Sequence, residues 1–368
     1  MLHLFAGYNQ TPRGDLQKKH SDPATLGIKG LYIKKPLQKY SFVQRWFQEN
    51  EYGQLLAKQI RQFKPDVVVS ANTPLNAQSL AMKRCKQENA RFIFWLQDLL
   101  GMGASRLLRQ KSVLLATVVG NYYIWLEKQL LSNSDQIILI TNDFRAILDK
   151  WRIDRQKVHV IPNWAPLESI SPQSKENPWA LKNDLLNSFC FIYSGTLGMK
   201  HNPELIWQLA SHFNSKDVKI VVVSEGLGAQ WLVEKNKEYQ LKSLKILNFQ
   251  PFNDFQFVLA SSDVLIGILE PDAGIFSVPS KVLSYLCAKR AILFALPQEN
   301  LAAKIIQENG AGIIVDPTCG NAFIEAAEKL FTDADLRNRF AENGREYAES
   351  HFNIKEIANK FEGIISSL

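Results

Sequence analysis

The chain has 368 residues, of which 46% are hydrophobic and 21% charged, and no apolar run is long and uninterrupted enough to predict a transmembrane helix. This length exceeds one typical domain and predicts two α/β domains of about 150 to 200 residues each. The formal net charge of +7 favours an anionic partner, which a nucleotide, a nucleic acid or an acidic membrane surface could supply.

The first half of the chain alternates predicted strands and helices. A short apolar strand is predicted at Leu2 to Ala6, and apolar side chains at helical spacing predict a helix over residues 42–63 and another from Leu75 to Asn89. Buried parallel strands are predicted at Asp66 to Ser70, Arg91 to Asp98, Asp135 to Thr141 and Val158 to Pro162. This alternation implies a doubly wound parallel sheet whose ligands bind beyond the carboxyl ends of the strands, where Asp98 stands.

Residues 104–131 have two interpretations. Arg106, Arg109 and Lys111 precede a nearly apolar block and an aromatic cluster, a combination that suits a membrane interface. The same pattern also fits a long core helix whose first turn is basic and solvated.

The stretch from Pro162 to Pro178 is rich in proline, serine and asparagine, and we place the domain boundary there. The predicted N-terminal domain spans residues 1–165 and the C-terminal domain residues 179–345. The second domain restarts the alternation with a strand at Phe189 to Ser194 and a helix from Glu204. Two glycines in the loop between them permit a tight turn under a phosphate, and Lys200 and His201 favour negative charge there.

The stretch from Ile268 to Pro297 predicts a strand end, a glycine-bearing loop, a helix and a further buried strand. Pro279 suits the first helical position, so the helix is expected to begin near Val278. The N–H groups of Ser280 and Lys281, with the lysine charge and the flexible Asp272-Ala-Gly274 backbone, would then form an anion site. The alternative is an ordinary loop-to-helix turn. After Pro297, the sequence predicts a strand within Gly310 to Val315 and helices from Asn321 to Phe331 and from Asp335 to Leu368.

Four motifs in this order resemble family 4 glycosyltransferases of the GT-B fold: Pro162-Asn163, Tyr193 to Gly198, Pro279-Ser-Lys281, and Asn343-Gly-Arg-Glu-Tyr followed by His351-Phe. Within that family the chain looks most like the branch that assembles bacterial cell-surface polysaccharides. The resemblance implies an α/β fold of two Rossmann-like doubly wound domains facing a cleft, with the sugar nucleotide in the C-terminal domain and the acceptor in the N-terminal one. It also implies retention of anomeric configuration, and residues 346–368 are expected to form a helix that packs toward the N-terminal domain.

The resemblance carries functional positions across to this chain. Gly195, Thr196 and Gly198 align with the loop that grips the diphosphate, and since Thr196 stands where many relatives have arginine, Lys200 or His201 must supply the charge. Asp98 matches an acidic strand end in the acceptor domain. The expected catalytic residues are Asp98, Lys200 and Lys281, and the nucleoside pocket is expected at Glu225, Gly226, Phe249 and Pro251.

The chain departs from the family at its two-glutamate motif. The two positions fall on Phe276 and Ser284, and neither residue is acidic. Glu270 or Asp272, in the loop with Gly274, is the candidate substitute for the donor-sugar contact, and Ser284 is a candidate hydroxyl partner for the ribose.

No metal or cofactor is predicted. The four cysteines form no CxxC pair, which also favours a reducing compartment, and Asp333-Ala-Asp335 lies between helices where a helix cap is expected. The leaving diphosphate would then be stabilised by Lys281, Lys200 and two helix N-termini.

The leading hypothesis is a cytoplasmic enzyme, peripheral at the inner membrane face, that moves a sugar from a nucleotide donor, expected to be UDP-linked, to a lipid-linked or glycan acceptor. A GT-B nucleotide-sugar epimerase and a catalytically inactive GT-B subunit that binds a partner are the alternatives. Nucleic-acid binding is disfavoured because the basic residues are dispersed.

The N-terminus carries a separate expectation. A GT-B acceptor domain ordinarily opens with a strand, a glycine-bearing loop and a helix, and Leu2 to Ala6 looks like the strand that follows that unit. We therefore expect about 30 to 45 residues upstream of Met1 in the natural protein, and little transferase activity from the 368 residues alone.

Overall fold

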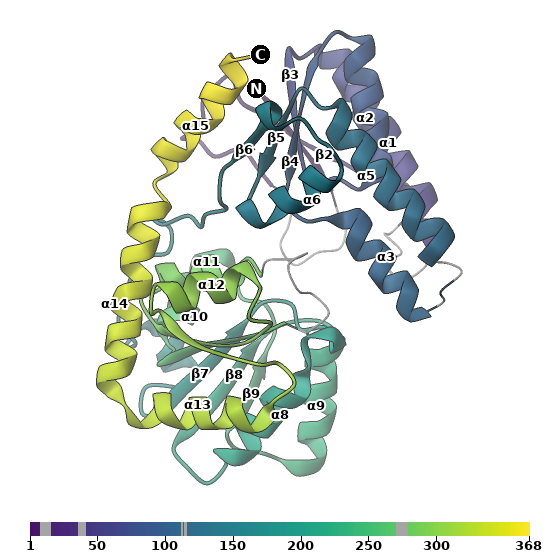
Figure 1. The fold of residues 1–368 in the computed structure, drawn as a ribbon. Coiled ribbons are helices and arrows are strands. Elements are labelled where there is room, and N and C mark those ends of the chain that lie inside the picture. The colour runs from purple at the N-terminus through teal and green to yellow at the C-terminus, as the bar shows by residue number, and fades with distance from the viewer. Residues whose placement is uncertain (8–15, 36–41, 112, 114–115, 270–278) are drawn as a thin grey trace. The chain divides into compact units, whose positions relative to one another are not determined.

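The computed structural model describes the chain except for residues 8–15, 36–41, 112, 114–115 and 270–278 (Figure 1). The chain divides into two compact units. Unit 1 comprises Met1–Pro162 with Asn359–Leu368, and unit 2 comprises Asn163–Ala358. Each unit carries its own parallel sheet, so the predicted α/β class is confirmed.

Unit 1 contains a four-stranded parallel sheet whose strands follow chain order. These are β3 (Val67–Ala71), β4 (Arg91–Leu96), β5 (Gln136–Leu139) and β6 (Val158–Val160), each within a predicted range or one residue beyond it. The predicted first strand, β1 (Leu2–Ala6), pairs in parallel with β2 (Gly27–Leu31) in a separate two-stranded sheet. The sequence did not predict β2, because its Gly-Ile-Lys-Gly-Leu run has two glycines, which are depleted in strands.

The helices of unit 1 are α1 (Phe42–Phe63), α2 (Leu75–Gln87), α3 (Leu100–Lys111), α5 (Asn121–Asn133) and α6 (Arg145–Lys150). Asn76, in the first turn of α2, connects α1 to α5, since its amide donates to Glu49 at 2.9 Å and to the Tyr123 hydroxyl at 3.0 Å. Near the other end of α2, the Lys86 ammonium donates to Asn133 at 2.8 Å. Because the starts of α2 and α5 contact each other and so do their ends, the two helices run in the same direction.

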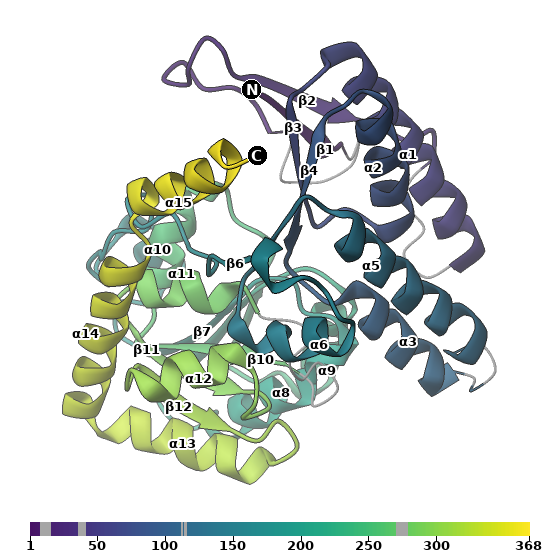
Figure 2. The same ribbon diagram turned by 45° about the horizontal axis from the view of Figure 1, so that its top comes forward.

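The interpretation of residues 104–131 as one long helix is wrong. The segment contains α3, a π-helical turn at Ala116–Gly120, and α5, and both Figure 1 and Figure 2 show α3 and α5 side by side. Glycines permit this close return of the chain, because a Cβ at Gly101 would lie 2.6 Å from the Tyr123 carbonyl oxygen and one at Gly120 2.6 Å from Ser105 Oγ. We call α3, the π-helical turn and α5 the helical hairpin.

Unit 2 contains a six-stranded parallel sheet in the order β12-β11-β10-β7-β8-β9. Its strands are β7 (Phe189–Ser194), β8 (Val218–Val223), β9 (Leu244–Leu247), β10 (Val264–Ile268), β11 (Ala291–Ala295) and β12 (Gly312–Val315). The chain builds outward from β7 to β9, then returns to the other side of β7 with β10 and builds outward again. The switch point of this topology lies between β7 and β10, where open α/β sheets bind their ligands.

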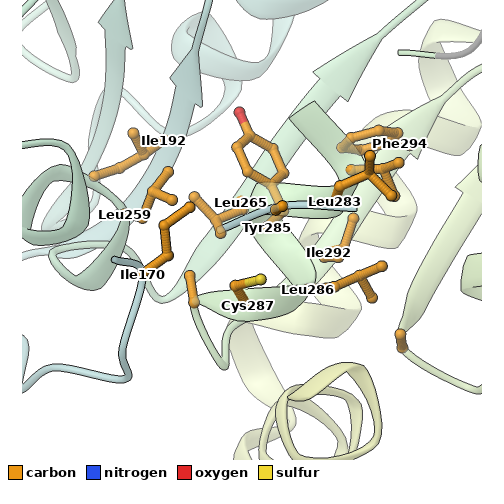
Figure 3. Close-up of a cluster of buried hydrophobic side chains, with 14 of the residues drawn as sticks. Ile170, Ile192, Leu259, Leu265, Leu283, Tyr285, Leu286, Cys287, Ile292 and Phe294 are labelled. Carbon is orange, nitrogen blue, oxygen red and sulfur yellow. The ribbon is translucent and has the colours of Figure 1, made fainter. Parts of the chain in front are cut away.

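Helices cover both faces of this sheet, with one buried apolar cluster on each face. Figure 3 shows the cluster that includes Ile192, Leu265 and Tyr285. The helices are α7 (Pro178–Lys182), α8 (Pro203–His212), α9 (Leu227–Tyr239), α10 (Phe255–Ala260), α11 (Lys281–Cys287), α12 (Leu301–Glu308), α13 (Gly320–Thr332) and α14 (Ala334–His351). The sequence did not predict α7, whose N-cap Asn177 accepts from the N–H groups of Trp179 and Ala180.

The predicted helix from Asp335 to Leu368 is two helices, α14 and α15 (Ile354–Ser366). The break follows from Phe352, which is buried in the core, and from Asn353, whose side chain accepts from the Lys355 N–H at 3.0 Å as a new N-cap. The predicted capping role of the Asp333 segment is confirmed, since Asp333 accepts from the Leu336 N–H at 2.8 Å.

Candidate functional site

The candidate site lies at the carboxyl edge of the unit 2 sheet, on either side of the switch point. Gly195 follows β7 directly, and Gly226 comes three residues after the end of β8. Lys281 is the first residue of α11, the helix that connects β10 to β11. The parallel topology therefore brings together three segments that the sequence singled out separately.

Two glycine-bearing loops, which follow β7 and β8, are bonded to each other at this edge. The N–H of Leu197 donates to the Glu225 carbonyl at 3.0 Å, and the N–H of Gly228 donates to the Leu197 carbonyl at 2.9 Å. Gly226 has φ +120°, and a Cβ there would lie 2.7 Å from the Leu197 carbonyl oxygen. Only glycine fits this position, because a side chain there would collide with the backbone of the neighbouring loop.

Lys281 places a buried cation beside the first of these loops. Its Nζ lies 3.6 Å from the centroid of the Tyr193 ring, and a Cβ built on Gly195 would be 3.4 Å from it. Burial lowers the pKa of Lys281 from 10.5 to about 7. Among the described residues no carboxylate forms an ion pair with this ammonium, and the residue as a whole is partly exposed.

The helix that carries Lys281 begins later than predicted. Its first residue is Lys281, and Ser280 rather than a residue before Pro279 is the N-cap. The Pro279 carbonyl accepts from the Val282 N–H at 3.1 Å, and the Ser280 carbonyl accepts from the Leu283 N–H at 3.2 Å. Pro279 and Ser280 thus form a tight i to i+3 turn ahead of the α-helical pattern, and Val278 lies outside the described residues.

The charge candidates of the first loop differ in their contacts. His201 Nδ1 accepts a hydrogen bond from the Gly198 N–H at 2.9 Å, so that nitrogen carries no proton in this contact. The backbone of Lys200 lies in the 3₁₀ turn Met199–His201, and its side chain lies outside the described part of the structure. Thr196 is exposed, and its carbonyl accepts from the Tyr193 hydroxyl at 2.9 Å.

The remaining predicted residues divide between the two units. Phe249 and Pro251 follow β9, next to β8 in the sheet, and Ser284 lies in the first turn of α11. Asp98 lies in unit 1, just past the end of β4. Glu270, Asp272 and Gly274 fall outside the described residues.

The sequence analysis missed two buried residues of unit 2 and one of unit 1. Tyr193 and Tyr285 are fully buried beside Lys281, and Tyr285 lies four residues after Lys281, a helical spacing that could have suggested a shared face. In unit 1, Glu127 of α5 is completely buried and accepts from the Gly101 N–H at 3.1 Å. The pKa of Glu127 is raised from 4.5 to about 8, mainly because burial disfavours the charged form. The N–H groups at the start of α3 lower this pKa in part, and the charge of Asp98 adds a small increase.

No cluster of three or more metal-ligating side chains occurs among the residues that the structure describes. The two loops, the buried ammonium and the switch-point position therefore offer anion recognition by backbone and lysine.

Comparisons with known proteins match both units. Residues 32–164 match the glycosyl transferase 4-like domain, and residues 182–347 match the glycosyl transferases group 1 domain. WcaI of Escherichia coli K12, which carries the name of a colanic acid biosynthesis glycosyl transferase, is 22% identical over 311 residues, 82% of this chain and 74% of that protein. An Escherichia coli UDP-Gal:alpha-D-GlcNAc-diphosphoundecaprenol alpha-1,3-galactosyltransferase is 24% identical over 267 residues, 66% of this chain and 62% of its own length.

Solved structures are similar over nearly the whole chain. Anabaena Alr3699/HepE in complex with UDP has a TM-score of 0.71 at 13% identity, covering 93% of this chain and 86% of that one. WaaG, a glycosyltransferase involved in lipopolysaccharide biosynthesis, has a TM-score of 0.68 at 16% identity, covering 92% of this chain and 87% of its own. These likenesses confirm the predicted GT-B fold.

Proposed function

The chain belongs to the family 4 glycosyltransferases of the GT-B fold, which are transferase enzymes, and we propose that it is a retaining transferase acting in cell-surface polysaccharide synthesis. In this proposal it moves a sugar from a UDP-linked donor to a lipid-linked or glycan acceptor. The donor binds unit 2, and the acceptor binds the N-terminal domain. The single observation that carries the proposal is the Lys281 ammonium, which lies buried beside Gly195 without a carboxylate partner among the described residues.

A diphosphate is the ligand that this arrangement suits. A buried cation without a counter-ion is costly, and an anionic ligand removes that cost by restoring the charged form of the lysine. The Gly195 and Gly226 loops let a ligand approach the backbone closely. The UDP donor is supported by the solved complex of Alr3699/HepE with UDP and by the UDP-linked donor in the name of the galactosyltransferase.

The proposed roles of the individual residues combine the family resemblance with this geometry. Gly195, Thr196, Gly198 and Lys281 contact the diphosphate, with Lys200 as the further cation, because His201 Nδ1 is engaged as an acceptor. Glu225, Gly226, Phe249 and Pro251 line the nucleoside pocket, with Pro279, Ser280 and Ser284 at the start of α11 and Glu270, Asp272 and Gly274 on the donor sugar side. Asp98 serves the acceptor side.

Loss of the buried cation tests the donor site. Lys281→Ala should weaken UDP binding at least tenfold, since one charge-assisted contact contributes about 1.5–3 kcal/mol. The matched control is Lys289→Ala, because Lys289 follows the same helix but pairs with Glu342 at 2.7 Å. Titration calorimetry measures the UDP affinity of wild type and both variants. Equal UDP affinity in wild type and Lys281→Ala would show that Lys281 does not bind the donor.

Turnover distinguishes the enzyme from the inactive subunit. The natural-length protein, with any residues upstream of Met1 restored, should release UDP from a UDP-sugar when an undecaprenyl-diphosphate-linked acceptor is present, and the anomeric configuration of the product should equal that of the donor. Tight UDP binding without turnover of any UDP-sugar would favour the inactive-subunit alternative, and release of a free epimerised sugar would favour the epimerase.

The helical hairpin supports a second element of the proposal, peripheral contact with the inner face of the membrane. No helix among the described residues has the length and apolar character needed to cross a bilayer. The hairpin nevertheless exposes Val113 at 71%, Val118 at 64% and Trp125 at 54%, and it also exposes the side chains of Arg106 and Arg109. Apolar and aromatic side chains next to arginines suit the interface of an anionic bilayer.

Sedimentation with anionic liposomes tests this contact. Binding should fall with salt, and an Arg106→Ala/Arg109→Ala variant should bind several-fold more weakly than wild type. A control variant, Arg91→Ala/Arg155→Ala, removes two exposed arginines that pair with Asp135 and Asp149 and should bind as wild type does. If both double variants lost the same amount of liposome binding, the loss would reflect the change in net charge and not a specific contact of the hairpin.

A further inference from the structure

Tyr285 joins the two strands that flank the switch point. Its ring packs in the apolar cluster on one face of the unit 2 sheet, and Figure 3 shows its hydroxyl pointing away from the labelled apolar side chains. The hydroxyl accepts from the Ser194 N–H at 2.9 Å, and two carbonyl oxygens can accept its proton: Ile266, the nearer, at 3.2 Å, and Ser194 at 3.3 Å. Ser194 ends β7, and Ile266 lies in β10.

The orientation of these two backbone groups follows from their neighbours. In a strand, successive N–H groups point to opposite sides. The Gly195 N–H donates to the Val223 carbonyl oxygen of β8 at 3.1 Å, so the Ser194 N–H points the other way, toward β10. The Leu269 N–H donates to the Ala295 carbonyl oxygen of β11 at 2.9 Å. Ile266 lies three residues earlier, an odd spacing, so its carbonyl points to the opposite side, toward β7. The Ser194 N–H and the Ile266 carbonyl therefore point toward each other.

A direct hydrogen bond between these groups would continue the parallel ladder. The β7 and β10 register pairs Val264 with Phe191 and Leu265 with Ile192, and it ends there. One more step would let the Ser194 N–H donate to the Ile266 carbonyl. The Tyr285 hydroxyl is inserted between them, so it replaces one ladder bond with two and keeps both buried groups satisfied. By contrast, β7 and β8 pair over the full length of β7.

Tyr193 fixes the loop from the other side. Its hydroxyl donates to the Thr196 carbonyl at 2.9 Å, and its ring lies under the Lys281 ammonium at 3.6 Å. Phenylalanine would fill both core positions equally well, yet both hydroxyls are bonded to the backbone at or beside the Gly195 turn. Packing alone therefore does not account for the two phenols.

We propose that Tyr193 and Tyr285 are positioning residues for the nucleotide site: Tyr285 parts β7 and β10 at the switch point, and Tyr193 supports the Gly195–Gly198 loop and the Lys281 ammonium. This inference rests on the proposed donor site. Because Lys281 and Tyr285 lie one helical turn apart in α11, the same inserted hydroxyl that separates the strands also sets the height of Lys281 above the Tyr193 ring.

The test compares UDP affinity with thermal stability in hydroxyl-deletion variants. Tyr285→Phe should weaken UDP binding about tenfold, and Tyr193→Phe several-fold, in calorimetry on folded protein. A purely structural role would lower the Tm and leave the UDP affinity of the folded fraction unchanged. The matched control is Tyr347→Phe, which alters a half-buried tyrosine stacked on His351 in α14 and should change neither affinity nor Tm appreciably.

The outcomes separate this inference from the donor assignment. If Lys281→Ala weakens UDP binding but both tyrosine variants bind UDP as wild type does, the positioning role is overturned and the donor site stands. If wild type binds no UDP, the donor assignment itself fails. Should Tyr285→Phe not fold, Tyr193→Phe decides, because it leaves only the carbonyl of the exposed Thr196, which water can hydrate.

Discussion

Each unit holds an ionisable side chain with a strongly shifted pKa near the carboxyl edge of its parallel sheet, Glu127 in unit 1 and Lys281 in unit 2, and their surroundings differ. In unit 1 the Glu127 carboxylate accepts from the Gly101 N–H at the start of α3. In unit 2 the Lys281 ammonium has the Tyr193 ring and the Gly195 turn as neighbours and no carboxylate partner among the described residues. The N–H groups at the start of α3 already have a carboxyl acceptor from their own unit, whereas Lys281 of unit 2 has no carboxyl partner among the described residues.

This difference indicates where a phosphate can bind. A helix N-terminus attracts anions through its free N–H groups, but a buried carboxylate from the same domain occupies those of α3. A ligand phosphate would have to displace Glu127 at a large desolvation cost. In unit 2 a bound diphosphate would instead supply a negative charge beside Lys281, which supports our proposal that the donor binds there.

Removal of the buried Glu127 carboxyl group should have the largest effect on the free energy of unfolding. Glu127→Ala leaves buried N–H groups of α3 without an acceptor, and we expect a loss of about 1–3 kcal/mol in the free energy of unfolding. Glu88→Ala is the control, because Glu88 pairs with Arg84 at 3.5 Å near the surface and should cost under about 1 kcal/mol. Urea denaturation measures both, and equal losses would show that Glu127 does not stabilise the start of α3.

A smaller effect should appear in the pH dependence of stability, with opposite signs for the two residues. The pKa of Glu127 rises from 4.5 to about 8 on folding, so the folded state binds the extra proton and this contribution is lost as pH rises through that window. The pKa of Lys281 falls from 10.5 to about 7, so its contribution is present at high pH and is lost as pH falls through about 7.

The variants Glu127→Gln and Lys281→Met remove these contributions separately. Relative to wild type, Glu127→Gln should flatten the decline of stability between pH 5 and pH 8. Lys281→Met should flatten the rise of stability above pH 7. The Tm measured as a function of pH over both intervals checks both variants. A change in the slope of Tm against pH that has the same sign in both variants would contradict the comparison.

Much of the fold was predictable, because unbroken apolar runs such as Phe189–Ser194 and Val264–Ile268 mark buried parallel strands. The loop glycines and Lys281 were predictable as well, since they follow those strands. Tyr285 was not, because its role depends on where the β7 and β10 register ends, and no local pattern encodes that. Glu127 was missed for a similar reason, since a carboxylate on a helix ordinarily indicates an exposed face.

The helix ends were the weakest part of the prediction. The sequence predicts Pro279 as the first helical residue, but the hydrogen bond from the Val282 N–H to the Pro279 carbonyl completes a turn before α11 begins. The end of α14 depends on the tertiary burial of Phe352, which outweighs the helical propensity of the flanking residues.

The central claim, that Lys281 is the open cation for the donor diphosphate, has a direct test in the protons exchanged on binding. At pH 8 most Lys281 side chains are neutral, since the pKa is about 7, and a bound diphosphate should restore the charged form. Calorimetric titration of UDP at pH 8 in two buffers of different ionisation enthalpy counts these protons. We predict that wild type takes up most of one proton per UDP and that Lys281→Ala takes up none; binding without proton uptake in wild type, or equal uptake in both proteins, would contradict the account.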